Sequence, residues 1–106
     1  PDLGSKVGAA VGYGEFEKGL LICTTGIGMS ITANKYHGVR AALCHNVDSA
    51  KYSRMHNDAN VLVLGAKYVK KGSAKKILEV FLMTAFEGGR HERRVGKIKS
   101  IEDKVL

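Results

Sequence analysis

Three short apolar runs, separated by stretches with helical spacing, constrain the fold of this chain more than any other feature. The runs cover residues 20–23, 39–44 and 60–64, and each ends where a polar or glycine-rich loop begins. Continuous apolar runs of this length are typical of strands that are covered on both faces, as in a parallel sheet. The runs therefore predict an α/β fold in which strands and helices alternate.

Helices are expected between and after these strands. Residues 27–35 and 48–55 have helical composition, the second with Asp48 or a neighbour as its cap. Residues 73–86 predict a helix with Ser73 as its N-cap. Their apolar side chains are spaced for one helical face, namely Ile77, Leu78, Phe81, Leu82 and Ala85. The basic C-terminal segment, residues 88–106, predicts a final amphipathic helix that needs a packing surface, with Val95, Ile98, Ile101 and Val105 as its apolar positions.

The size and composition of the chain predict one soluble domain over residues 1–106. Hydrophobic residues make up 44% of the sequence and charged residues 25%, and no apolar run reaches the length of a membrane span. The first residues lack the pattern of a secretory signal, so we expect a cytoplasmic protein without a membrane partner. Cys23 and Cys44 both lie in apolar runs, and we expect two reduced thiols.

A net charge of +7 predicts an anionic ligand, and a glycine-rich turn offers a place for it. In the turn at residues 23–28, Gly26 and Gly28 allow backbone N–H groups to approach an anion, and Cys23 stands at the carboxyl end of a strand, where parallel sheets bind ligands. Thr25 and Ser30 add hydroxyl groups. The alternative is a tight strand-to-helix connection without a ligand. The spacing of the glycines does not match the loops that bind ATP or NAD.

Two further clusters carry residues suited to catalysis or anion binding. His56 and Asn57 precede the third apolar run, and a histidine there can act as acid or base or can serve only to satisfy helix-end carbonyls. Arg90 and Arg94 are four residues apart and share one face of a helix, where they form a fork for phosphate or a solvated basic helix end.

In order along the chain, these segments resemble one protein family. The segments are Cys-x-x-Gly-x-Gly-Met-Ser, Ala-Asn-Lys, Gly-Val-Arg-Ala-Ala-Leu-Cys, His-Asn-Asp-Ala-Asn-Val-Leu and Phe-Glu-Gly-Gly-Arg-His-x-x-Arg-Val. They are similar to the ribose-5-phosphate isomerase B family, which includes galactose-6-phosphate and allose-phosphate isomerases, from residue 1 to about residue 101. The resemblance implies a Rossmann-like three-layer αβα sandwich. It also implies a homodimer or dimer of dimers with active sites at subunit interfaces.

The resemblance assigns a role to each candidate residue. Cys23 is implied as the base that moves a proton between C1 and C2 of an open-chain sugar phosphate, through an enediolate. The turn from Thr24 through Thr25, Gly26 and Ile27 to Gly28 is implied to hold the enediolate oxygens with its N–H groups. The resemblance implies that Thr25 and His56 assist ring opening. The remaining contacts to the sugar and its phosphate are implied for Asn57, Lys67, Arg90 and Arg94. Neither a metal nor an organic cofactor is implied.

The sequence departs from the family pattern at three points. Thr24 stands where most members have glycine, so its Cβ and methyl group occupy space that a substrate could use, and Lys67 stands where arginine is common. The family's N-terminal strand, helix and second strand have no counterpart before Pro1, so we expect the chain to be a fragment. A short form that depends on a partner subunit is the alternative.

Three functions follow as hypotheses. The first is a ribose 5-phosphate isomerase, or an isomerase of a related hexose 6-phosphate. The second is a noncatalytic or partner-dependent subunit with the same fold. The third is nucleic-acid binding through the basic side chains, which lack an aromatic stacking platform; these are Lys67, Lys70, Lys71, Lys75, Lys76, Arg90, Arg93 and Arg94. We expect no nucleic-acid partner.

Overall fold

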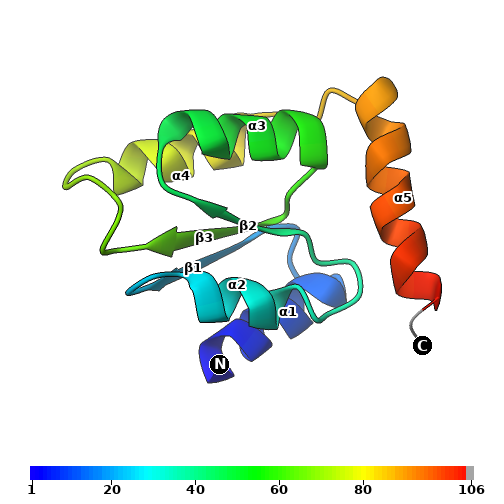
Figure 1. The fold of residues 1–106 in the computed structure, drawn as a ribbon, viewed down its shortest axis with the longest axis horizontal. Helices are drawn as coiled ribbons and strands as arrows, with labels where there is room; N and C mark the ends of the chain where they lie inside the picture. Colours follow the sequence, from blue (N-terminus) through cyan, green and yellow to red (C-terminus); the bar gives the residue numbers. More distant parts are fainter. Residues whose placement is uncertain (105–106) are drawn as a thin grey trace.

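A computed structural model of the protein describes residues 1–104 and has α-helices on both faces of a small sheet. The elements in chain order are α1 (Asp2–Gly12), β1 (Gly19–Cys23), α2 (Ile27–Ala33), β2 (Ala41–Cys44), α3 (Val47–Asn57), β3 (Val61–Gly65), α4 (Ala74–Met83) and α5 (Arg90–Lys104). Figure 1 shows α1 and α2 on one face of the sheet, α3 and α4 on the other, and α5 apart from both layers, across one end of the strands. The α/β sandwich with a parallel sheet is confirmed.

The central strand explains why the sheet needs cover on both faces. The strands have the order β1-β3-β2, and β3 pairs in parallel with both neighbours. Successive side chains of a strand point to opposite faces. Val61 and Val63 therefore join the core under α1 and α2, while Leu62 and Leu64 join the core with Ile77 and Phe81 of α4. All of β3 is buried, so its continuous apolar sequence follows from its position.

Two predicted strand boundaries move because Asn60 uses its side chain as a backbone partner. Its Oδ1 accepts the N–H of Arg40 at 2.7 Å, and its Nδ2 donates to the carbonyl of Gly38 at 2.7 Å. Arg40 therefore lies outside β2, which begins at Ala41 rather than at residue 39. Asn60 lies outside β3, which runs to Gly65.

The helices also differ from their predicted bounds. Helix α2 ends at Ala33, two residues early, and α3 runs from Val47 to Asn57 with Asn46, a near neighbour of Asp48, as its N-cap. The Asn46 side chain accepts from the N–H of Ser49 at 2.8 Å, and the Ser49 hydroxyl accepts the N–H of Asn46, which forms a capping box.

The predicted helix over residues 73–86 is shorter than expected. It ends at Met83, because Thr84 has an extended backbone, and Ser73 precedes the helix without a side-chain cap bond. Ile77 and Phe81 are buried as predicted, but Leu82 is exposed and Ala85 lies beyond the helix.

Helix α1 was not predicted, because its packing face is made of glycine rather than of large apolar residues. Gly4, Gly8 and Gly12 recur every four residues, and α1 packs against α2. A Cβ on Gly8 would lie 2.7 Å from the Tyr36 ring, and one on Gly12 would lie 2.6 Å from the carbonyl oxygen of His37. Helix α1 packs closely on α2 and on the loop that follows it because those Cβ atoms are absent.

Helix α5 confirms the predicted amphipathic C-terminal helix. Val95 is buried, and the Glu102 carboxylate accepts the N–H of Gly38 at 3.0 Å, which fixes the far end of the helix. Ile98 and Ile101 stay 44% and 57% exposed. Val105, the last predicted apolar position, lies outside the described residues. Among residues 1–104, no helix combines the length and the apolar character that a membrane span requires.

Candidate active site

The predicted thiol lies where the sequence placed it, at the carboxyl end of β1. We call residues 23–28 the thiol turn. Within it the N–H of Gly26 donates to the Sγ of Cys23 at 3.0 Å, and the N–H of Ile27 donates to the Thr25 hydroxyl at 3.3 Å. Cys23 and Thr25 are half-buried, and Thr24 is exposed. The turn therefore presents its sulfur in a fixed direction and leaves one side open to solvent.

Two glycines let the thiol turn pack against the sheet. Gly26 has a φ of 79°, in the left-handed region, and a Cβ there would collide with the side chain of Leu43. A Cβ on Gly65, the last residue of β3, would collide with the carbonyl oxygen of Thr25. Gly28 has open space around it, so packing within the chain does not require a glycine there.

The loop after β3 brings Lys67 beside the thiol turn. The N–H of Ala66 donates to the carbonyl of Cys23 at 2.7 Å, and the N–H of Lys67 donates to the carbonyl of Thr24 at 2.9 Å. The Lys67 side chain is exposed. A positive charge therefore stands next to the thiol turn.

His56 belongs to a separate group, at the end of α3. Its ring stacks on that of His91 with centroids 4.1 Å apart and planes 12° apart. The Oε1 of Glu87 lies 3.7 Å from the Nε2 of His56 and 3.5 Å from the Nε2 of His91. We call His56, Glu87 and His91 the imidazole cluster. Neither Glu87 nor His91 was predicted as a site residue, although both stand in the motif around Arg90.

Arg90 and Arg94 flank the imidazole cluster from the first turns of α5. Both side chains are exposed, and the positive charges of both act on His91. Burial is the main cause that lowers the pKa of His91 below its usual 6.5; the charges of His56, Arg90 and Arg94 lower it further, and Glu87 opposes the shift. The two arginines therefore place positive charge beside a histidine whose pKa is lowered.

A buried arginine, not singled out in the sequence, fixes the end of α3 beneath His56. Arg54 is 7% exposed. Its guanidinium donates to the carbonyls of Thr84 at 3.0 Å and Ala59 at 2.6 Å, and to the carboxylate of Asp58 at 3.0 Å. Asp58 caps α3 in the left-handed conformation. The carbonyls of Ser53, Arg54 and Met55 at the end of α3 accept backbone N–H groups from Ala59, Asp58 and Glu87, so they do not need the His56 side chain as a partner.

The thiol turn and the imidazole cluster lie at opposite ends of the sheet in one chain. Helix α3 starts at the carboxyl ends of the strands and returns to their amino ends before β3 begins. At 1.5 Å per residue its 11 residues span about 16 Å. Figure 1 shows the strands pointing away from the end that α5 crosses. One chain therefore separates Cys23, Thr25 and Lys67 from His56, Asn57, Arg90 and Arg94.

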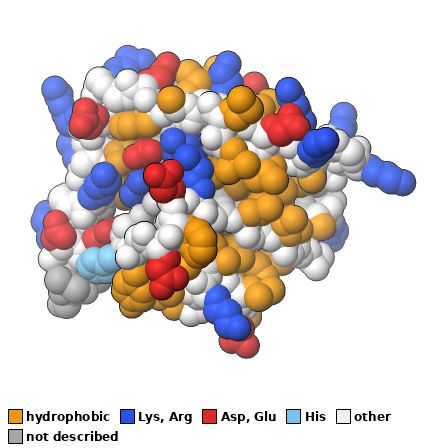
Figure 2. Space-filling model, turned by 180° about the vertical axis from the view of Figure 1, so that it is seen from behind, with side chains coloured by type: hydrophobic (Ala, Val, Ile, Leu, Met, Phe, Trp, Pro, Cys, Tyr) orange, Lys and Arg blue, Asp and Glu red, His pale blue; other side chains and the backbone are white. Residues whose placement is uncertain are grey.

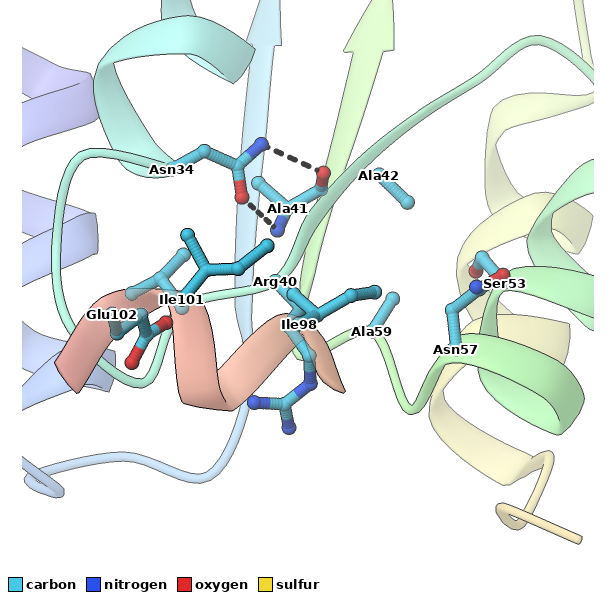
Figure 3. A pocket seen from close by; sticks show the side chains of 11 residues that line it. Asn34, Arg40, Ala41, Ala42, Ser53, Asn57, Ala59, Ile98, Ile101 and Glu102 are labelled. Atoms are coloured by element: carbon cyan, nitrogen blue, oxygen red, sulfur yellow. Dashed lines mark hydrogen bonds between the residues drawn. The ribbon is translucent and has the colours of Figure 1, made fainter. Parts of the chain in front are cut away.

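A groove lies beside Asn57, between the open edge of β2 and α5 (Figure 3). Its volume is about 470 Å³. Its walls are apolar where Ala41, Ala42, Ile98 and Ile101 line it. The side chain of Asn34 bonds both the N–H and the carbonyl of Ala41, at 2.8 and 3.0 Å, and so occupies part of the strand edge (Figure 3).

Both cysteines are free thiols, in agreement with the sequence prediction. Cys44 is buried, and burial raises its pKa despite hydrogen bonds with Ser49 and Ser53 that act in the other direction. Of the two, only Cys23 is accessible enough to meet a substrate.

The basic side chains do not form one surface. Residues 67–76 lie at the carboxyl end of β3 and in the first turn of α4, whereas Arg90, Arg93 and Arg94 lie across the amino ends of the strands. Figure 2 shows most lysine and arginine side chains at the outline of the rear face, one basic group near its centre beside acidic side chains, and hydrophobic side chains between them. This distribution disfavours a continuous nucleic-acid track.

Comparisons with known proteins place this geometry among sugar-phosphate isomerases. The profile of a family described as Ribose/Galactose Isomerase matches residues 1–98. A ribose-5-phosphate isomerase B of Escherichia coli is 47% identical over 98% of this chain and 70% of its own length. The structure of ribose-5-phosphate isomerase B from Clostridium thermocellum superposes with a TM-score of 0.96 at 51% identity, over the whole chain and 72% of that structure. A D-erythrulose-4-phosphate isomerase of Pectobacterium atrosepticum is 43% identical over 92% of this chain and 64% of its own length.

Proposed function

The chain belongs to the Ribose/Galactose Isomerase family, and we propose that it interconverts ribose 5-phosphate and ribulose 5-phosphate with Cys23 as the base. The observation that carries the proposal is the thiol turn, in which Cys23 stands at the carboxyl end of β1 with its sulfur fixed by the Gly26 N–H. The high identity to ribose-5-phosphate isomerases supports the choice of substrate.

The proposed reaction moves one proton between adjacent carbons. The Cys23 thiolate removes the proton from C2 of the open-chain aldose, and the electron pair of that bond forms the C1–C2 double bond of an enediolate. The thiol then returns a proton to C1, while the proton on O2 moves to O1, which leaves the ketose. The N–H groups of the thiol turn would stabilise the negative oxygens as charge develops on them. Balance requires no oxidant or cofactor.

In a second proposal, residues from another copy of this chain complete the active site. Ring opening needs Thr25 and His56 together, and phosphate binding needs Arg90 and Arg94 near Cys23, but about 16 Å separates the two ends of α3. We propose that the thiol turn of one copy meets His56, Asn57, Arg90 and Arg94 of a second copy. The apolar groove beside Asn57 supports this arrangement, because a second copy would cover Ile98 and Ile101. The assembly would be a homodimer or a pair of dimers.

A different sugar phosphate is the alternative substrate. Thr24 is exposed at the thiol turn, where its methyl group occupies space next to Cys23. The relative named for D-erythrulose 4-phosphate has a shorter substrate, and the resemblance to galactose-6-phosphate isomerases favours a longer one. Comparing kcat/KM for tetrose, pentose and hexose phosphates on the purified protein decides among them.

Solvent isotope exchange tests the proposed base. In deuterium oxide the protein should convert ribose 5-phosphate and leave deuterium at C1 of the product. Cys23→Ala should lower the rate by about 100-fold to 10,000-fold, because proton transfer loses its base. Cys44→Ala is the matched control, since its buried thiol has no access to substrate. Exchange at the normal rate in Cys23→Ala would exclude the thiol as base, and a wild-type protein without turnover on any sugar phosphate would favour the noncatalytic subunit.

Mixing two inactive variants tests the shared site. Cys23→Ala and His56→Ala are each expected to be inactive alone. After co-refolding, half of the dimers are mixed, and each mixed dimer has one site free of both changes, so about a quarter of the wild-type activity should return. If mixing restores nothing while size measurements show mixed dimers, each chain would have to build its own site.

A further inference from the structure

We propose that Glu87 is a positioning residue for the opening of the sugar ring, and that it acts by stabilising the protonated imidazole of His56. The inference rests on the function proposed above, in which His56 takes part in ring opening. Glu87 is the acidic member of the imidazole cluster. Its Oε1 lies 3.7 Å from the Nε2 of His56 and 3.5 Å from the Nε2 of His91.

Backbone contacts place the Glu87 carboxylate at the end of α3. The N–H of Glu87 donates to the carbonyl of Met55 at 3.1 Å, directly before His56 in the chain. Gly88 and Gly89 follow with positive φ, at 71° and 57°, and the N–H of His91 donates back to the carbonyl of Gly88 at 3.1 Å. The loop therefore keeps its path without the carboxylate charge, so a change of that charge alone leaves the backbone in place.

The stack of the two imidazoles determines how the carboxylate can act. The rings of His56 and His91 lie with centroids 4.1 Å apart and planes 12° apart. One oxygen that is nearly equidistant from two stacked rings cannot lie in both ring planes, and the two distances exceed the usual 2.7–3.2 Å of an N–H to O bond. The carboxylate therefore acts through its charge, and it can move closer to one ring at a time.

His56 is the ring of the stack that is suited to carry a charge. His91 is 7% exposed, and burial is the main cause that lowers its pKa, followed by the charge of His56. Arg90 and Arg94 act in the same direction, and Glu87 opposes them. The side chain of His56 is 38% exposed and open to a sugar. The carboxylate thus offsets the arginines, whose charges disfavour a protonated ring in this region.

Opening a furanose ring requires a group that moves protons. The O1 hydroxyl loses its proton, and the electron pair of that O–H bond forms the C1 carbonyl. The C1–O4 bond breaks, its electron pair goes to O4, and O4 takes up a proton. Whether His56 accepts the first proton or supplies the second, its protonated form lies on the path. Glu87 stabilises that form, although its side chain is 47% exposed and water screens part of its charge.

Ribulose 5-phosphate separates ring opening from proton transfer at carbon. Its O5, which would close a five-membered ring on the C2 carbonyl, carries the phosphate, so this ketose is open-chain. Exchange of its C1 hydrogen in deuterium oxide needs the enediolate at the thiol turn but no ring opening. Glu87→Gln should lower kcat for ribose 5-phosphate by about tenfold or more, yet change this exchange rate by less than about twofold. KM should not rise, because Arg90 and Arg94 still hold the phosphate.

Three variants serve as references. Glu92→Gln is the matched control, because it removes the same charge from an exposed position on α5 outside the imidazole cluster, and it should retain both rates. His56→Ala should show the pattern of Glu87→Gln with a larger loss, about 100-fold or more on ribose 5-phosphate. Cys23→Ala should lose both reactions. Circular dichroism checks that Glu87→Gln, a change of the same size at an exposed position, is folded.

The two reactions also distinguish the possible failures. If Glu87→Gln slows both reactions equally, or slows neither, Glu87 does not position His56 for ring opening, and the proposed isomerase activity still stands. If the wild type catalyses neither reaction, the proposed function fails and the role of Glu87 fails with it.

Discussion

The carbonyl oxygen of Thr25 lies directly against the Cα of Gly65, so the thiol turn rests on the end of the central strand. We predict that Gly65→Ala lowers stability by about 1–3 kcal/mol, because the new Cβ must push the turn away. The same shift moves Cys23 and should reduce turnover more than stability alone explains. Urea unfolding and a sugar-phosphate isomerase assay measure the two effects.

Gly96→Ala is the control for that substitution. Gly96 lies in α5 with open space around it, and alanine there should stabilise the helix by about 0.5–1 kcal/mol. A Gly65→Ala protein as stable and active as the wild type would show that the turn does not rest on β3 as described.

Arg54→Met should destabilise the protein by roughly 2–4 kcal/mol, because it removes a buried guanidinium and leaves the carbonyls of Thr84 and Ala59 without that partner. The loss of Arg54 leaves the Asp58 carboxylate with one partner, because Asp58 keeps its contact with Arg40 at 3.4 Å. Asp58 is also partly exposed, so its contribution to the loss of stability corresponds to the lower part of this range. Chemical unfolding measures the loss. Arg93→Met, at an exposed position on α5, should change stability by less than about 0.5 kcal/mol. Equal effects of the two changes would contradict the structural role of Arg54.

Ile101→Glu should separate the proposed dimer, because the charge would lie in the apolar groove between α5 and β2. Light scattering should report the mass of one chain, and turnover should fall with the assembly. Leu82→Glu is the matched control, since Leu82 is 52% exposed on α4, away from the groove, and that variant should keep the wild-type mass. A wild-type protein that is already monomeric would refute the shared site.

Stability should fall more steeply below about pH 6.5 in the wild type than in His91→Gln. The folded pKa of His91 is lowered, chiefly by burial and then by the charges of His56, Arg90 and Arg94, against the opposing charge of Glu87. Below the ordinary value of 6.5 the unfolded chain therefore takes up a proton that folded His91 does not, and the free energy of unfolding decreases as the pH falls.

Urea unfolding of the wild type and of His91→Gln at pH 8 and pH 5 measures this difference. Both proteins retain His56 and Glu87, so the comparison isolates the contribution of His91. A proton NMR titration of the His91 ring should independently give a midpoint below 6.5. A midpoint at or above that value would contradict the prediction, as would equal pH dependence in the two proteins.

Local patterns in the sequence predicted most of the elements and the thiol turn. The central strand β3 appears as an apolar run because it is buried throughout, whereas Ile22 of the edge strand β1 is 54% exposed. The pairing of Arg90 with Arg94 follows from helical spacing alone. Helix α1 escaped prediction, because Gly4, Gly8 and Gly12 form its contact face and glycine gives no apolar signal. Asn60 likewise shortened two strands through side-chain bonds that spacing does not encode.

The sequence by itself determined which residues could carry the chemistry: a thiol after a strand, a histidine at a helix end and two arginines on one helix. Only the tertiary structure decided which of these residues lie at the same end of the sheet and which lie at opposite ends. Helix α3 must run back along the sheet to connect parallel strands, so its length carries His56 to the end opposite Cys23. The meeting of Glu87 with His56 and His91 also depends on how the loop after α4 crosses the end of α3. Such contacts join distant segments, and the identity of the residues does not specify them until the chain is packed.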